Sequence, residues 1–210
     1  MSNLKYLEFN NKRIGPLDSE ILTFLNTKVD LFDDLDVLGN QIYIEHENIK
    51  YLFDVKDIKS YEFEKVIKVP VLNNKTRYSL ILDVGCSYGG FSISNANKNT
   101  KFISVEYDTK LYSNFLKNIE LNKKNGLIQP IFISENLESN NIASKNIRNI
   151  TELRQIINIL GFENIDLIRF DSRINNALIE KFLSKYEKNQ IPNYIISHNK
   201  FINFKNGKIT

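Results

Sequence analysis

The stretch LILDVGCSYGGFS (80–92) decides the fold. It begins with a short apolar run that ends at Gly85, which is typical of a buried parallel strand. Gly85 and Gly89 let the backbone turn tightly and let a ligand approach without a Cβ in the way. The helix that follows offers free backbone N–H groups. The stretch therefore predicts a strand, a tight turn and a helix, with a ligand site at the turn.

Downstream of this stretch, apolar runs and amphipathic segments alternate. Strands are predicted over 101–108, 127–134, 164–171 and 193–199, and helices over 111–121, 151–159 and 174–186. Pro130 argues either for an edge position of its strand or for a bulge in it. Residues 201–210 are a candidate closing hairpin with Asn206 and Gly207 at its turn. The sheet therefore either stops at five strands or is extended by this hairpin. Strands alternating with helices predict an α/β fold with a doubly wound, mostly parallel sheet.

The first part of the chain has a different pattern. Asp18 begins a short amphipathic helix that includes Ile21 and Leu25. Residues 41–55 are typical of two short strands joined by a turn at 46–48. We therefore expect a small α+β appendage over residues 1–78, followed by a Rossmann-like domain over residues 79–210.

Composition excludes several classes of protein. The single cysteine, Cys86, rules out a disulfide framework and a multi-Cys zinc site, and His46 and His198 are too far apart in sequence to suggest a metal site. No apolar run approaches the ~20 residues that cross a bilayer, so no membrane partner is expected. The N-terminus has no signal-peptide pattern, which favours a cytoplasmic location.

Charge is distributed unevenly along the chain. Residues 1–70 hold 9 Lys or Arg and 13 Asp or Glu, whereas residues 71–210 hold 19 and 12. The mildly basic second part suits either a polyanion such as RNA or an ordinary solvated surface. The charge distribution alone therefore does not decide between RNA binding and an ordinary solvated surface.

An acid closes the second strand of the predicted sheet. Glu106 follows Asp83 by 23 residues, and a carboxylate at such a position can accept both hydroxyls of a ribose. Ser87 stands where a dinucleotide fingerprint needs glycine, and the G-K-[ST] of a P-loop is missing. The pattern favours a nucleoside ligand without a phosphate, and the alternative is an ordinary strand-to-helix turn.

Three stretches resemble class I S-adenosylmethionine-dependent methyltransferases, and within these the FkbM-type family most. Residues 80–92 resemble its D-V-G-x-x-x-G-x-F-S motif. Residues 104–122 resemble its second strand end and a helix ending in N-I-x-L-N, and residues 151–171 resemble its helix, Gly and I-D-x-[IL]-K-[IL]-D. The resemblance implies S-adenosylmethionine as cofactor and a small-molecule or sugar hydroxyl as methyl acceptor.

The same resemblance implies roles for single residues. The loop around the methionine part of the cofactor would be formed by Asp83, Gly85, Ser87, Tyr88 and Gly89. Glu106 would hold the ribose, Tyr107 would pack on the adenine, and Ser134 and Glu135 would lie near the adenine amino group. Asp171 would face the methyl group and the acceptor.

The chain departs from the family after Asp171. The Gly and the trailing acid of the family pattern are replaced by a segment that contains Arg173. Arg173 is a candidate for recognising an anionic substrate, and His198 at the fifth strand end is a candidate base, the alternative being an exposed turn histidine. Asp171 itself is either an active-site group or an ion-paired structural residue beside Arg169 and Arg173.

Three functions stay open at this point. The first is the O-methyltransferase. The second is an RNA methyltransferase, because residues 114–122 also resemble a helix of tRNA guanine methyltransferases, although the [DN]-P-P-[FY] motif is missing. The third is a non-catalytic protein that keeps the fold for binding. The open strand edge of the sheet also leaves a homodimer open.

Overall fold

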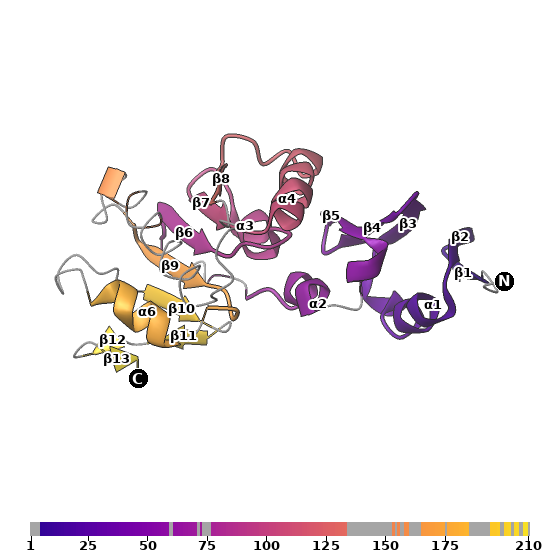
Figure 1. The fold of residues 1–210 in the computed structure, drawn as a ribbon. Helices are drawn as coiled ribbons and strands as arrows, with labels where there is room; N and C mark the ends of the chain where they lie inside the picture. The colour runs from indigo at the N-terminus through magenta and orange to yellow at the C-terminus, as the bar shows by residue number, and fades with distance from the viewer. Residues whose placement is uncertain are drawn as a thin grey trace.

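The centre of the molecule is a six-stranded sheet in the order β11-β10-β9-β6-β7-β8 (Figure 1). The structure is a computed structural model that describes residues 5–58, 61–70, 72, 77–133, 153, 155, 158–159, 165–174, 176–184, 194–197, 200–202, 204–205 and 208–209. The strands are β6 (Leu80–Val84), β7 (Lys101–Glu106), β8 (Ile128–Phe132), β9 (Leu167–Phe170), β10 (Tyr194–Ser197) and β11 (Lys200–Ile202). The first five run parallel, and β11 pairs antiparallel with β10.

This topology confirms the predicted doubly wound α/β fold. The chain builds β6, β7 and β8 outward in one direction, then crosses back to place β9 and β10 on the other side of β6. Pro130 lies in β8 at the edge of the sheet, as expected of a residue that cannot donate a ladder hydrogen bond. The sheet continues beyond five strands, because β11 joins it.

The N-terminal part contains more strands than the sequence predicts. The predicted helix and strand pair are present as α1 (Ser19–Asn26), with the Asp18 side chain capping it, and as β4 (Gln41–His46) and β5 (Ile49–Asp54). The additional elements are β1 (Lys5–Phe9), β2 (Lys12–Leu17), η1 (Val29–Leu31), β3 (Asp34–Leu38) and η2 (Val55–Asp57). Strands β3, β4 and β5 form one antiparallel sheet, and β1 and β2 form a hairpin.

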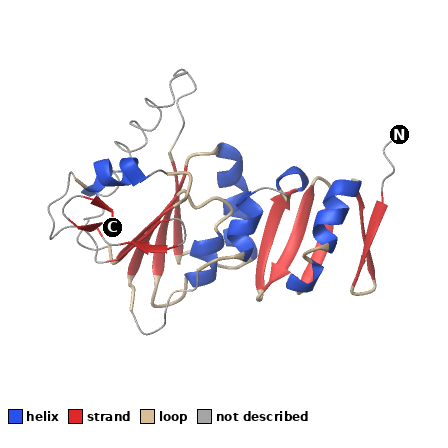
Figure 2. Ribbon diagram, turned by 90° about the horizontal axis from the view of Figure 1, so that it is seen from below, coloured by secondary structure: helices blue, strands red, loops and turns tan. Residues whose placement is uncertain are grey.

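Two helices lie between the three-stranded and six-stranded sheets (Figures 1 and 2). They are α3 (Gly90–Asn95) and α4 (Thr109–Leu121), and α2 (Tyr61–Ile67) lies beside them. Phe91 of α3 and Phe115 of α4 belong to one hydrophobic cluster with residues of both sheets. These include Phe53 of β5 and Phe102 of β7. One continuous core therefore joins the N-terminal part to one face of the central sheet.

The opposite face of the central sheet has a second hydrophobic cluster. Helix α6 (Asn176–Leu183) buries Ile179, Phe182 and Leu183 against Leu82 and Ile168 of the sheet. Short strands β12 (Phe204–Lys205) and β13 (Lys208–Ile209) pair antiparallel, which agrees with the predicted closing hairpin. The predicted helix over 151–159 lies largely outside the described residues. No helix in the described part of the chain is long and apolar enough to cross a membrane.

Asparagines on α4 fix this helix to the edge of the three-stranded sheet. The Asn118 side chain accepts a hydrogen bond from the Leu52 N–H (2.7 Å) and donates to the Tyr88 carbonyl (3.1 Å). Asn122 accepts from the Lys50 N–H (2.9 Å) and donates to the Lys50 carbonyl (2.6 Å). These amides satisfy the backbone of β5 where no further strand continues the sheet.

We expect Asn118→Ala to lower the free energy of unfolding by about 1–3 kcal/mol, because it leaves the Leu52 N–H without an acceptor in a buried position. Chemical denaturation monitored by circular dichroism measures the loss. The exposed neighbour Lys117 provides a matched control, and Lys117→Ala should leave stability unchanged. Equal stability of the two variants would contradict the role given to the amide.

Candidate functional site

The turn after β6 uses three residues in the left-handed region. Gly85 (φ 78°), Ser87 (φ 57°) and Gly89 (φ 87°) alternate along it. A Cβ on Gly89 would lie 2.4 Å from the Phe115 ring, so packing inside the protein requires this glycine. The space next to Gly89, where a ligand was expected to approach, is therefore filled by the protein's own core.

Glu106 lies beside this turn, as the sequence predicts, and is fully buried. Its Oε2 accepts a hydrogen bond from the Ser87 N–H (2.7 Å). Its Oε1 accepts from the N–H groups of Tyr107 (2.9 Å) and Asp108 (3.0 Å). Three backbone donors thus orient the carboxylate and compensate its burial.

Arg173 brings the ends of β6, β7 and β9 together. Its Nε donates to Asp171 Oδ1 (2.7 Å), and its Nη2 donates to Glu106 Oε2 (3.0 Å) and to the Gly85 carbonyl (3.4 Å). The guanidinium carbon also lies 5.1 Å from the centre of the Tyr107 ring. We call Gly85, Glu106, Tyr107, Asp171 and Arg173 the switch-point cluster.

The position of this cluster in the fold is that of a ligand site. Strands β6 and β9 are neighbours, and the chain leaves them toward opposite sides of the sheet. In open α/β sheets, ligands bind outside the carboxyl ends of the strands at such a change of direction. A Cβ on Gly85 would lie 2.7 Å from the Asp171 Cβ and 3.4 Å from Arg173 Nη2, so this glycine permits the close approach across the switch point.

Asp83 lies behind the cluster in a buried polar network. It is fully buried, its Oδ1 accepts from Arg169 Nη1 (2.6 Å), and its Oδ2 accepts from the Ser92 hydroxyl (2.5 Å). The Ser92 hydroxyl also contacts that of Ser104 (2.7 Å). Burial alone would lower the pKa of the Arg169 guanidinium, but Asp83 and then Asp171 raise it above its ordinary value.

Tyr88 and Cys86 are directed into the protein interior. Tyr88 is fully buried, its ring centre lies 4.6 Å from that of Phe53, and its hydroxyl donates to Asp57 (2.7 Å). Burial, and next this hydrogen bond, raise the pKa of Tyr88 well above its ordinary value. Burial, and next the Glu106 and Asp83 carboxylates, raise the pKa of the Cys86 thiol, which suits a packing residue and not a nucleophile.

Some of the remaining predicted site residues lie in the described part of the chain and others lie outside it. Asp171 is buried next to Arg173, and Arg169 Nη2 lies 3.9 Å from its Oδ2, so both arginines named as its ion-pair partners are near. Ser134, Glu135 and His198 lie outside the described residues. His46 lies near the predicted turn, with Nδ1 2.6 Å from the Leu31 carbonyl oxygen.

Sequence reasoning missed the partnership of Asp83 with Arg169. Both are charged residues within otherwise apolar strands, and a buried charge requires a partner. That requirement was the available signal, and the pairing of β6 with β9 in the structure meets it. Within the described residues, no group of three or more His, Cys, Asp or Glu is placed to hold a metal ion.

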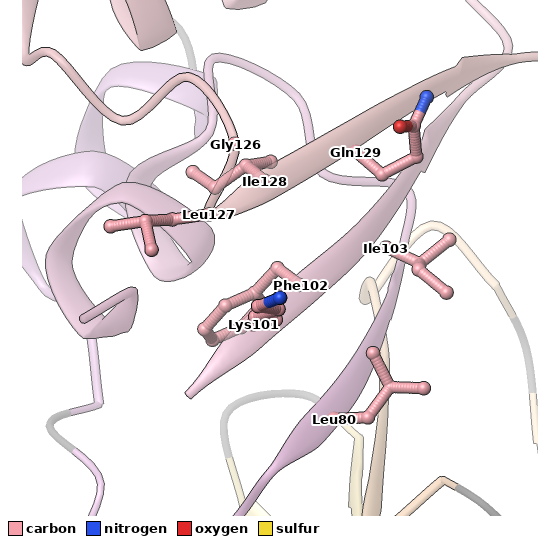
Figure 3. Close-up of a pocket in the computed structure, with 8 residues that line it drawn as sticks. All are labelled: Leu80, Lys101, Phe102, Ile103, Gly126, Leu127, Ile128 and Gln129. Carbon is pink, nitrogen blue, oxygen red and sulfur yellow. The ribbon is translucent and has the colours of Figure 1, made fainter. Parts of the chain in front are cut away.

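A separate hollow of about 240 Å³ lies at the amino ends of β6, β7 and β8 (Figure 3). Its lining is mostly apolar, including Leu80, Phe102 and Leu127, with Lys101 and Gln129 as polar members. This is the opposite edge of the sheet from the switch-point cluster. Because ligands of open α/β sheets bind at the carboxyl edge, the cluster and not this hollow is the candidate site.

Neither a model of a known protein family nor a curated protein matches the chain. Among solved structures, the chain is similar to several methyltransferases at 13–16% identity. M. jannaschii TYW2 in complex with AdoMet is 16% identical with a TM-score of 0.48, and the match covers 78% of this chain and 64% of that one. P. horikoshii TYW2 in complex with MeSAdo is 14% identical with a TM-score of 0.42, covering 86% and 66%.

A third similar structure is the C-terminal domain of precorrin-6Y C5,15-methyltransferase from Rhodobacter capsulatus. It is 13% identical with a TM-score of 0.38, and the match covers 58% of this chain and 54% of that one. The chain spans 42–66% of the length of the similar structures. Structural similarity at such low sequence identity does not establish a function. The function therefore has to be inferred from the geometry of the switch-point cluster.

Proposed function

We propose that the chain binds S-adenosylmethionine at the switch-point cluster and acts as a methyltransferase. The observation that carries the proposal is the buried Glu106 carboxylate, held by three backbone N–H groups beside the left-handed turn at the carboxyl edge of the sheet. A fixed carboxylate there suits the two hydroxyl donors of a ribose.

The residues present fit an adenosyl ligand on condition that Arg173 leaves Glu106. Glu106 would then accept the ribose hydroxyls, Tyr107 would offer an aromatic face to the adenine, and the Gly85 carbonyl would accept a polar hydrogen of the ligand. Ser134 and Glu135 remain proposed neighbours of the adenine. Asp83 and Tyr88, which the resemblance placed around the cofactor, would support the turn from behind, because both side chains are buried and hydrogen-bonded elsewhere.

When bound, the cofactor supplies a methyl group already activated by a sulfonium. The chain contributes alignment and a base for the acceptor proton. Asp171 is the proposed base, since it lies at the end of β9 across from Gly85, and His198 remains a second candidate. Arg173, bonded to Asp171 through Nε, would position that carboxylate.

The proposed acceptor is a hydroxyl of a small molecule or sugar, as the FkbM-type resemblance implies. The RNA alternative relied partly on residues 114–122. In the structure, Asn118 and Asn122 of this segment bind the backbone of β5, so internal packing accounts for them. That leaves the basic second part of the chain as the remaining support for RNA.

One observation favours a second candidate, a non-catalytic binding protein. Arg173 bridges Glu106 and Asp171, and it stands in the segment where the family pattern has a Gly and a further acid. A guanidinium that permanently occupies the cluster would exclude the cofactor. The fold would then serve only for binding or assembly.

Calorimetric titration with S-adenosylmethionine and S-adenosylhomocysteine tests the proposal. We expect saturable binding and a rise in the unfolding temperature, because a ligand that binds only the folded state stabilises it. Tyr107→Ala should weaken the binding by about tenfold, through loss of base stacking worth about 1–3 kcal/mol. Tyr6→Ala, at an exposed tyrosine of the β1–β2 hairpin, is the control and should bind like the unchanged protein. Absence of binding to both ligands would rule the proposal out.

A further inference from the structure

Arg173 occupies hydrogen-bonding positions that an adenosyl ligand requires. Its Nη2 binds Glu106 Oε2 and the Gly85 carbonyl, both proposed acceptors for the ligand, and its guanidinium lies over the Tyr107 ring, the proposed adenine face. The side chain is 27% exposed, so solvent reaches it. It can therefore leave the cluster more readily than the buried groups around it.

Part of the Arg173 attachment does not involve the proposed ligand positions. The backbone N–H of Arg173 donates to Asp171 Oδ1 (2.9 Å), and its Nε donates to the same oxygen (2.7 Å). These two bonds can persist when Nη2 gives up Glu106. The positive charge would then remain beside Asp171, next to the bound ligand.

The charge that Arg173 keeps beside the bound ligand affects which ligand the cluster prefers. Asp83 and Arg169 form a buried ion pair that is neutral as a unit. In front of this pair, the described residues of the cluster supply the carboxylates of Glu106 and Asp171 and the guanidinium of Arg173. Arg173 therefore neutralises part of the negative charge that would otherwise attract a sulfonium.

We infer that Arg173 is a specificity-determining residue that exchanges with the ligand on Glu106 and reduces the preference of the two carboxylates for a sulfonium cation over the neutral thioether. This rests on the proposed function. Like charges within several ångströms in a partly buried site repel strongly enough to change affinity by about tenfold or more. The unchanged protein then favours S-adenosylmethionine over S-adenosylhomocysteine less strongly than the same protein without this charge.

The test compares the dissociation constants of both ligands in the unchanged protein and in Arg173→Met, which removes the charge but keeps an unbranched chain. We expect Arg173→Met to bind S-adenosylmethionine at least about tenfold more tightly than the unchanged protein. Its affinity for S-adenosylhomocysteine should rise less, so the ratio of the two constants shifts toward S-adenosylmethionine. Arg13→Met, at the arginine stacked on Tyr6 in the N-terminal hairpin, is the matched control and should change neither constant.

A second variant covers the case in which Arg173→Met is poorly folded. In Arg173→Ala, free guanidinium ion at a concentration that leaves the circular dichroism unchanged should compete with S-adenosylmethionine. It should not compete in the unchanged protein, whose own guanidinium fills the position. Such competition would support the exchange directly.

Two results would overturn the inference, and they differ in what else they affect. Binding of both ligands with the same ratio in the unchanged protein and in Arg173→Met would refute selection by Arg173 and leave the proposed function standing. Binding of neither ligand by the unchanged protein or by any folded variant would refute the proposed function, and the inference with it.

Discussion

Replacing Asp83 by Ala is expected to lower the free energy of unfolding by about 3–5 kcal/mol. The loss comes from Arg169, whose side chain is 6% exposed and whose Nη1 donates to Asp83 at 2.6 Å. Without this partner, the guanidinium remains buried with Asp171 Oδ2 3.9 Å away as its nearest described carboxylate oxygen. The Ser92 hydroxyl also loses its charged acceptor. Urea denaturation of the purified variant measures the change.

Two further variants identify the cause of this loss. Asp30→Ala removes an exposed acid from the N-terminal part and should leave stability unchanged. The double variant Asp83→Leu with Arg169→Met replaces the pair by apolar residues and should recover most of the stability, because no buried charge is then left alone. A double variant as unstable as Asp83→Ala would show that packing around β6, and not the unpaired charge, causes the loss.

The central sheet could be predicted from the sequence because its local signals and its tertiary role agree. Each parallel strand is a short apolar run bounded by turn residues, and α4 carries its buried residues on one face, among them Leu111, Phe115 and Ile119. Strands that alternate with helices then pair in parallel through right-handed crossovers. The carboxyl edge could be named as the candidate site for the same reason, because ligands of open α/β sheets bind there.

Strands β1, β2 and β3 of the N-terminal part escaped prediction because their local signals are weak. The β1–β2 hairpin turns at Asn10 and Asn11, which both have positive φ, and this dipeptide is a weaker hairpin signal than Asn-Gly. Strand β3, with the sequence DLDVL, is rich in aspartate, which is depleted in strands. It is a strand because it pairs with β4 over five residues, and that pairing is a tertiary effect.

The sequence indicated which strand ends lie near one another, but not the connections between their side chains. Glu106 was expected beside the turn because strand ends meet at one edge. The bond from Arg173 to Glu106 joins residues 67 positions apart, and the pair of Asp83 with Arg169 joins residues 86 positions apart. Such contacts depend on which face each side chain takes and on its rotamer. A single sequence therefore leaves them undetermined.

Replacing Glu106 by Ala is expected to lower the free energy of unfolding by about 3–6 kcal/mol. The carboxylate is fully buried and accepts from the backbone N–H groups of Ser87, Tyr107 and Asp108. An unsatisfied buried donor costs about 1–3 kcal/mol, and Arg173 also loses one of its two carboxylate partners. Thermal and urea unfolding give the loss, and Glu120→Ala, at an exposed acid on α4, should leave stability unchanged.

The expected instability changes how the role of Glu106 in ligand binding has to be tested. Weaker binding by Glu106→Ala would follow from a distorted turn as well as from lost ribose contacts. Glu106→Gln separates the two, since its amide oxygen can still accept from Tyr107 and Asp108 while its NH2 group faces the Ser87 N–H and Arg173. It should therefore be less destabilised than Glu106→Ala. If Glu106→Gln is folded yet binds S-adenosylhomocysteine as tightly as the unchanged protein, then Glu106 supports the turn without holding the ligand.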